Sequence, residues 1–117
     1  MDIESYIWIT TQFTGFHRYP NAPDAVEFLK NEHRHIFKVR IDIEVFHDDR
    51  EIEFFLFKDF VENEVIDTGR NFQNLSCEMI ADEIYAMIRL RYPHRKMIIE
   101  VSEDGENGAK KIYNEER

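Results

Sequence analysis

At 117 residues, with 43% apolar and 14% aromatic side chains, the chain suits one folded domain with a single core rather than a disordered protein. Its formal net charge of −9, without a cluster of Lys or Arg, argues against nucleic acid as a partner. No apolar run reaches the roughly 18 residues of a membrane span, and M-D-I-E-S lacks the pattern of a secretory signal, so we expect a cytoplasmic protein without membrane contact.

Three strands are expected in the first half of the chain. Residues 6–13, Y-I-W-I-T-T-Q-F, are rich in the β-branched and aromatic side chains that favour strands. Residues 35–46 alternate apolar and charged side chains, which makes them the clearest strand. The H-D-D-R sequence at 47–50 is typical of a turn, and E-I-E-F-F-L-F at 51–57 is expected to return as the third strand.

Two helices follow. The apolar spacing predicts a short helix over 58–66, interrupted by D-T-G-R-N at 67–71. Ser76 is a candidate N-cap of a longer helix, with Glu78 in the first turn, where the helix dipole favours negative charge. That helix is expected to end before Pro93. Its apolar side has i, i+4, i+7, i+8 spacing: Ile80, Ile84, Met87 and Ile88.

The chain is expected to close with a strand at 96–102, a turn at 103–108 and a short strand at 110–113. The order strand, strand, strand, helix, helix, strand, strand (βββααββ) predicts one α+β domain over 1–117, with two helices on one face of an antiparallel sheet. The many aromatic side chains suggest that the other face is also covered, which in so small a chain requires neighbouring subunits.

A histidine pattern in E-H-R-H-I-F-K-V points to a metal site. His33 and His35 lie two residues apart on a predicted strand, so both side chains face one side while Arg34 faces away. His17 lies at the end of another strand-like run, and three imidazoles would hold zinc with a fourth position open. The alternative is that the H-x-H pair is an accident of a sheet rim. His47 and His94, beside turn residues, are expected to be solvated.

Four sequence blocks together resemble the tunnelling-fold family of 6-pyruvoyl-tetrahydropterin synthase and 6-carboxy-tetrahydropterin synthase. F-T-G-F-H-R-Y-P at 13–20 is similar to the family's first block, which ends in a zinc histidine, and E-H-R-H-I-F-K-V at 32–39 resembles its H-G-H block. N-L-S-C-E-M-I-A at 74–81 resembles its N-P-T-x-E-N helix start, and I-I-E-V-S-E-D at 98–104 its last long strand. The blocks occur in family order and span most of the chain.

The resemblance implies a tunnelling fold with zinc as cofactor. Its ligands would be His17, His33 and His35, and Glu103 would anchor a pterin- or guanine-like ring. A carboxylate suits that ring because it accepts two hydrogen bonds, from a ring N–H and from the neighbouring exocyclic amine.

The helix-start block adds Ser76 and Glu78 as candidate ligand-binding residues. Family members assemble into rings through their sheets, with ligand sites between subunits. A homo-oligomeric ring, for example a hexamer, is therefore the implied assembly.

The catalytic residues of the family are only partly matched. The usual cysteine before H-x-H and the Asp–His pair after the first helix have no evident counterpart. Some relatives carry a glutamate in place of the cysteine, so Glu27 and Glu32 are the candidate catalytic groups, of which Glu27 is the better placed. The alternative for Glu27, which its surroundings in D-A-V-E-F-L-K favour, is a solvated face of a short helix. Cys77, the single cysteine, is interpreted as a half-buried residue near the helix N-cap rather than a nucleophile.

Two functions follow from this pattern. The first is a zinc-dependent enzyme that acts on a pterin or purine-nucleotide-like ligand, with the metal as Lewis acid and a glutamate moving protons. The second is a non-catalytic oligomer that holds or sequesters a guanine-, pterin- or nucleotide-like ligand. A third reading is a structural oligomer whose histidines bind no metal. The histidines would also accept iron or nickel.

Overall fold

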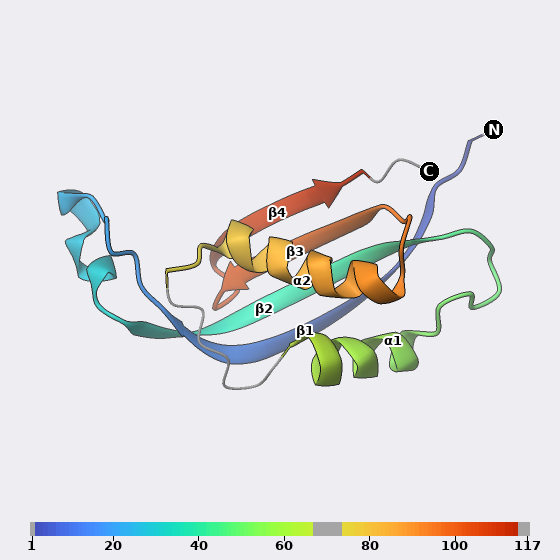
Figure 1. Cartoon of the computed structure of the whole chain (residues 1–117), viewed down its shortest axis with the longest axis horizontal. Helices are drawn as coiled ribbons and strands as arrows, with labels where there is room; N and C mark the ends of the chain where they lie inside the picture. Colours follow the sequence, from blue (N-terminus) through green and yellow to red (C-terminus); the bar gives the residue numbers. More distant parts are fainter. Residues whose placement is uncertain (1, 67–73, 115–117) are drawn as a thin grey trace.

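The structure, a computed structural model, describes residues 2–66 and 74–114. Two strands, a helical region, a second helix and two more strands follow one another along the chain (Figure 1). Their bounds are β1 Ser5–His17, η1 Asp24–Lys30, β2 His33–Val45, α1 Phe54–Phe60, η2 Val61–Val65, α2 Cys77–Arg91, β3 Met97–Glu103 and β4 Asn107–Tyr113. The predicted α+β class is confirmed, and the predicted order βββααββ is corrected to ββααββ.

The four strands form one antiparallel sheet in the order β1-β2-β3-β4. β1 pairs with β2 over its full length and ends with His17 opposite His33. β3 pairs with the other side of β2, and the register places Phe37 opposite Glu103. The hairpin to β4 turns through Gly105, whose φ of +74° favours glycine. The end of β1, the start of β2 and the end of β3 therefore meet at one end of the sheet.

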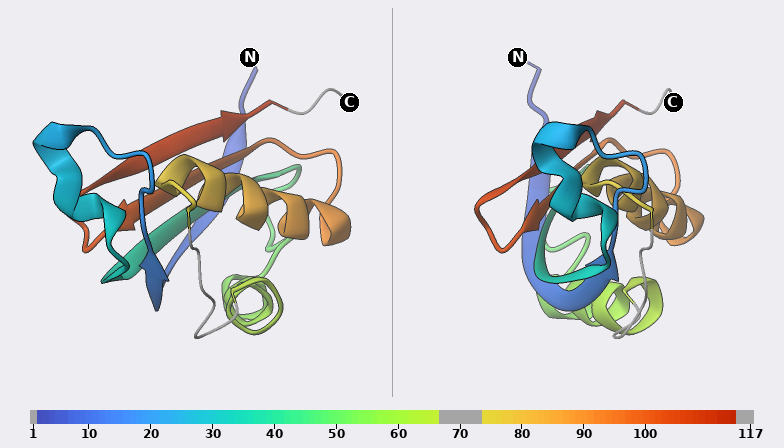
Figure 2. Two further views of the ribbon diagram at one scale, coloured as in Figure 1. Left: turned by 60° about the vertical axis from the view of Figure 1, so that its left-hand side comes forward. Right: turned by 90° about the vertical axis from the view of Figure 1, so that its left-hand side faces the viewer.

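The hydrophobic core lies between the helices and one face of the sheet. Figure 2 shows α1 and α2 on the same side of the sheet, as the sequence predicted. The strand alternation and the helix periodicity supply one continuous cluster of buried side chains, which includes Phe37, Val39, Ile41 and Ile43 from β2, Phe57 and Val61 from the first helical region, and Ile80, Ile84 and Ile88 from α2.

The expected third strand at 51–57 is wrong, because most of that segment is helical. The side chain of Glu53 accepts hydrogen bonds from the backbone N–H of Phe55 at 2.8 and 3.0 Å and caps the start of α1. Burial then recurs every fourth residue, at Phe57, Val61 and Val65. The burial of apolar side chains at helical spacing has therefore outweighed the strand propensity of the aromatic residues in this segment. The expected interruption at 67–71 lies outside the described residues.

The longer helix forms as its capping signals indicated. Ser76 Oγ accepts a hydrogen bond from the backbone N–H of Met79 at 3.2 Å, and α2 ends before Pro93. Met87 is 40% exposed and does not share the burial of the other apolar positions. Among the described residues, no helix has both the length and the apolar character needed to cross a membrane.

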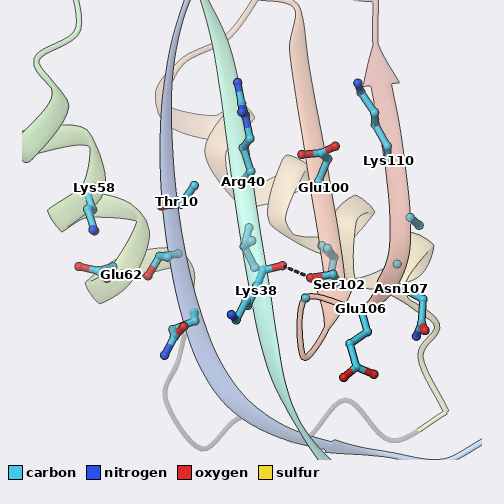
Figure 3. Close-up of a pocket in the computed structure, with 17 residues that line it drawn as sticks. Thr10, Lys38, Arg40, Lys58, Glu62, Glu100, Ser102, Glu106, Asn107 and Lys110 are labelled. Carbon is cyan, nitrogen blue, oxygen red and sulfur yellow. Dashed lines mark hydrogen bonds between the residues drawn. The ribbon is translucent and has the colours of Figure 1, made fainter.

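The other face of the sheet carries polar side chains, and these line a cavity of about 830 Å³ (Figure 3). The strand registers place four of them in one row across the sheet: Thr10, Arg40, Glu100 and Lys110. The Arg40 guanidinium donates to Asp42 at 2.8 Å and lies 4.2 Å from the ring centre of Trp8. The charges of this face therefore alternate in sign and offset one another.

Candidate metal centre

The register of β1 and β2 brings the three predicted ligand histidines together. His17 lies directly opposite His33, and the two-residue strand period puts His35 on the same face, while Arg34 is exposed on the other. The ring centre of His17 is 4.5 Å from that of His33 and 5.3 Å from that of His35, and the other two rings are 4.8 Å apart. The site therefore continues the helix-covered face beyond the apolar core.

A glycine makes room for the aromatic ring that packs against this cluster. Gly15 lies opposite His35, and a Cβ at this position would come within 2.8 Å of the Phe37 ring. That ring meets the edge of His17 with 5.2 Å between ring centres. The missing side chain at position 15 thus allows Phe37 to support the imidazoles from the core side.

Each imidazole is oriented by an oxygen at its Nδ1 atom. The Nδ1–H of His17 donates to the carbonyl of Leu75 at 3.1 Å, and that of His33 donates to the carbonyl of Asn31 at 2.8 Å. The Nδ1–H of His35 donates to a carboxylate oxygen of Asp104, also at 2.8 Å. In each neutral ring the Nε2 atom is then the free lone-pair donor, which is the usual arrangement of metal-binding histidines.

The Nε2 atoms converge with a carboxylate. Glu103 lies with one oxygen 2.8 Å from His35 Nε2 and the other 3.7 Å from His17 Nε2. One ligand atom from each of the four residues lies within 4.8 Å of the other three. His33 Nε2 and His35 Nε2 are buried and have no hydrogen-bond partner among the described residues. Because buried polar atoms are nearly always satisfied, this cluster of three histidines and one glutamate could hold a metal ion.

Electrostatics favour neutral histidine at the buried position. Burial lowers the pKa of His17 below its ordinary value of 6.5, outweighing the hydrogen bond to Leu75 and the charge of Glu103, which both raise it. The hydrogen bond from His35, together with the N–H of Ile36, lowers the pKa of Asp104. A neutral imidazole is the form that ligates metal, so burial favours the ligating form of His17.

A cavity of about 560 Å³ opens beside His17 and His33. It borders the N-terminal turn of α2, and all three candidate ligand-binding residues contribute to its lining: Ser76, Glu78 and Glu103. Tyr19 adds an aromatic ring. Its volume is within the range of about 300 to 1,000 Å³ typical of small-molecule sites. The cavity on the uncovered face is larger, but it lies on the opposite side of the sheet from the histidines.

The candidate catalytic glutamates lie elsewhere. Glu27 is exposed on η1, and Glu32 is exposed in the residue before β2 begins. Neither side chain lines the cavity beside the histidines. The structure therefore groups the predicted metal and ligand-binding residues but not the two predicted proton carriers. His47 and His94 are exposed, as expected.

Cys77 lines the same cavity but is a poor nucleophile. Its residue is buried, and burial followed by the charges of Glu103 and Glu78 raises the pKa of the thiol to about 11. The thiol thus stays protonated at neutral pH despite its place at the start of α2, which agrees with the interpretation that it is not a nucleophile, although the residue is buried rather than half-buried.

Asp104 is the site residue that sequence reasoning missed. It follows Glu103, and its second carboxylate oxygen accepts a hydrogen bond from the backbone N–H of Ile36 at 2.9 Å. Only the register of β2 and β3 brings position 104 beside His35, so no motif in the sequence pointed to it. The carbonyl groups that orient the other two rings are equally invisible in a side-chain pattern.

Comparison with known families and curated proteins identifies no relative. No protein-family model matches the chain, and no curated protein matches it. The likeness to the tunnelling-fold synthases therefore rests on the four sequence blocks alone.

Proposed function

We propose that this protein is a tunnelling-fold zinc protein, similar to the 6-pyruvoyl-tetrahydropterin synthases, that binds or acts on a pterin or purine-nucleotide-like ligand. One observation carries the proposal: three Nε2 atoms converge while two of them are buried without a hydrogen-bond partner among the described residues. An unfilled set of lone pairs is costly unless a cation joins it.

The donor set fits zinc. Zinc takes imidazole nitrogen at about 2.0 to 2.1 Å and carboxylate oxygen at about 2.0 to 2.2 Å in tetrahedral sites. His17, His33 and His35 would hold the ion, and the Nδ1 partners would keep each ring in the ligating tautomer. When bound, zinc supplies a Lewis acid that polarises an oxygen of a ligand. Iron and nickel accept the same donors and remain alternatives to test.

The cavity beside the histidines supports a flat heterocyclic ligand. Glu103 and Glu78 are hydrogen-bond acceptors in its lining, as the N–H and exocyclic amine of a pterin or guanine ring require. Tyr19 offers an aromatic surface for stacking, and Ser76 lies at the start of α2. These side chains would orient the ring, while the nearby metal site would receive the substituent that the ring carries.

Assembly into a homo-oligomeric ring, for example a hexamer, is part of the proposal. β1 and β4 are the outer strands of the sheet, and in the proposed ring these edge strands would pair with those of a second copy. The sheet face opposite the helices would then face other subunits, and the cavity would be completed between subunits. We propose a cytoplasmic location for this assembly.

Ligand binding without turnover is the second candidate function. Two observations favour it: the pKa of the Cys77 thiol is high, and neither Glu27 nor Glu32 is among the residues that line the cavity. In this form the oligomer would hold or sequester a guanine-, pterin- or nucleotide-like molecule.

Native mass spectrometry of the purified protein tests the proposal directly. We expect one zinc ion per chain, a ring-sized assembly and a co-purified heterocycle. A preparation that takes up no divalent metal during dialysis against zinc at about pH 7.5, where histidine is neutral, contradicts the metal site. Assays of the parent against pterins and dihydroneopterin phosphates then separate the two functions: turnover supports an enzyme, and no turnover supports a binding protein. Glu27→Gln tests the predicted proton carrier separately, since full turnover in this variant would exclude Glu27 from that role.

A further inference from the structure

The contact between Glu103 and His35 joins two hydrogen-bond acceptors. His35 uses its Nδ1–H to donate to Asp104, so the Nε2 of a neutral ring presents a lone pair. A carboxylate oxygen of Glu103 lies 2.8 Å from that Nε2. Two lone pairs at this distance repel each other unless a cation lies between them. That cation is either a metal ion or a proton.

The position of Glu103 is fixed by its backbone. It is the last residue of β3 and lies opposite Phe37. The next residue, Asp104, makes two hydrogen bonds with Ile36: its N–H donates to the carbonyl at 2.8 Å, and its carboxylate accepts from the N–H at 2.9 Å. Successive carboxylates thereby reach the two nitrogens of one imidazole, Asp104 at Nδ1 and Glu103 at Nε2.

The spacings from Glu103 to two of the histidines can be compared with those of a filled site. Donors about 2.0 to 2.2 Å from a tetrahedral zinc ion lie roughly 3.3 to 3.6 Å from one another. The distances from the Glu103 oxygens to His35 and His17, 2.8 and 3.7 Å, fall on either side of that range. The carboxylate of Glu103 therefore lies at about the separation from these two imidazoles that a shared ion requires.

We propose that Glu103 is the fourth ligand of the metal and keeps the site closed, an inference that rests on the zinc site of the proposed function. An external group reaches the metal only when this carboxylate leaves. Because Glu103 also lines the ligand cavity, a ring whose N–H and amine groups bind the carboxylate would draw it away and open the fourth position. Glu103 then couples occupation of the cavity to access to the metal.

Cobalt substitution tests whether the site is closed. Co²⁺ in place of zinc gives visible absorption that depends on its ligands, and thiocyanate serves as a small anionic probe of an open position. The spectrum of the parent protein is expected to be unchanged by thiocyanate. In Glu103→Ala the spectrum is expected to respond to thiocyanate, and zinc affinity to fall by at least about 10-fold, since even the loss of an outer partner of a ligand has that effect.

Two controls keep the result interpretable. Glu100→Ala removes a carboxylate from the same strand but from the opposite face, and it is expected to behave as the parent. Glu103→Gln, which keeps the shape of the side chain, replaces the alanine variant if the latter does not fold. It is also expected to bind zinc more weakly than the parent.

The outcomes separate this inference from the proposed function. If the parent responds to thiocyanate as Glu103→Ala does, and both bind zinc equally, Glu103 is not a ligand and only the inference is overturned. If the parent binds neither cobalt nor zinc, the metal site itself is wrong. The contact would then be explained by a shared proton between His35 and Glu103.

Discussion

The buried polar groups at the two ends of β2 differ in whether they are hydrogen-bonded within the protein. Near its end, Glu44 is 3% exposed, and its carboxylate accepts a hydrogen bond from the backbone N–H of Lys96 at 3.1 Å, while its carbonyl accepts from Arg95 at 2.9 Å. At its start, the Nε2 atoms of His33 and His35 are buried with no such partner among the described residues. The first arrangement is satisfied within the protein and stabilises the fold, whereas the second would be satisfied by the proposed metal ion.

The largest expected effect on stability comes from zinc binding to the histidines at the start of β2. Zinc at about 100 times its dissociation constant should stabilise the folded protein by about 2.7 kcal/mol, which corresponds to a rise in Tm on the order of 10 °C. His33→Ala removes a ligand and should abolish this rise. Thermal unfolding with zinc and with a chelator measures both effects. If the Tm of the parent protein is the same with and without zinc, the histidines at the start of β2 do not bind it.

The control for that experiment is a histidine away from the site. His47 is exposed in the turn after β2, where its Nδ1 accepts a hydrogen bond from the N–H of Asp49. His47→Ala is expected to keep the full response to zinc. Loss of the response in this variant as well would mean that zinc acts through scattered surface histidines.

A smaller effect is expected from the group that orients His35. Asp104→Asn places an amide N–H₂ or a weaker acceptor at the Nδ1–H of the ring, which disfavours the ligating tautomer. Zinc affinity should fall by about 10- to 100-fold, as measured by competition with a chromophoric chelator. Asp48→Asn, in an exposed turn, is the matched control, and equal affinities for the two variants would contradict the orienting role.

The smallest effect on stability is expected near the C-terminal end of β2, where the polar groups are already paired. Arg95 donates to Glu51, and this hydrogen bond, the largest cause, lowers the pKa of Glu51 to about 2. Since the folded pKa lies below the usual 4.5, the stabilisation is complete above about pH 4.5 and is lost as the pH falls toward 2. Glu51→Gln should lower the free energy of unfolding by about 1 kcal/mol near neutral pH and by little once the pH has fallen to about 2.

Denaturant titrations at the two pH values measure that difference. Glu64→Gln is the control, because Glu64 and Arg91 form an exposed pair with 3.6 Å between the charged atoms, and such pairs contribute little. An effect of Glu51→Gln that is equally large at both pH values would show that the ion pair is not its cause.

Much of the fold was readable in local patterns. The alternation of Phe37, Val39, Ile41 and Ile43 predicted the central strand and its buried face, and Ser76 predicted the start of α2. The error at 51–57 arose because that aromatic run favours a strand locally. The buried spacing of Phe57, Val61 and Val65 was present in the sequence, but assigning Phe57 to a strand concealed it.

The residues of the site were easier to predict from the sequence than the contacts between them. His33 and His35 share a strand face by parity, and that prediction needed no tertiary structure. The positions of Asp104 and of Glu103 beside His35 depend on the register of β2 and β3, which are separated in the chain by both helices. Long-range pairing of this kind leaves no local signature. The family resemblance pointed to Glu103 as a ligand anchor, but its contact with His35 and the contact of Asp104 with the same ring were visible only in the folded chain.

The stacking of Arg40 on Trp8 gives the molecule an optical reporter. Trp8 is the one tryptophan of the chain, and it lies 53% exposed on the sheet face opposite the histidines. Its fluorescence is therefore sensitive to whatever covers that face and is spatially separated from events at the imidazoles. The wavelength of its emission maximum would thus report on the proposed subunit packing without any added dye.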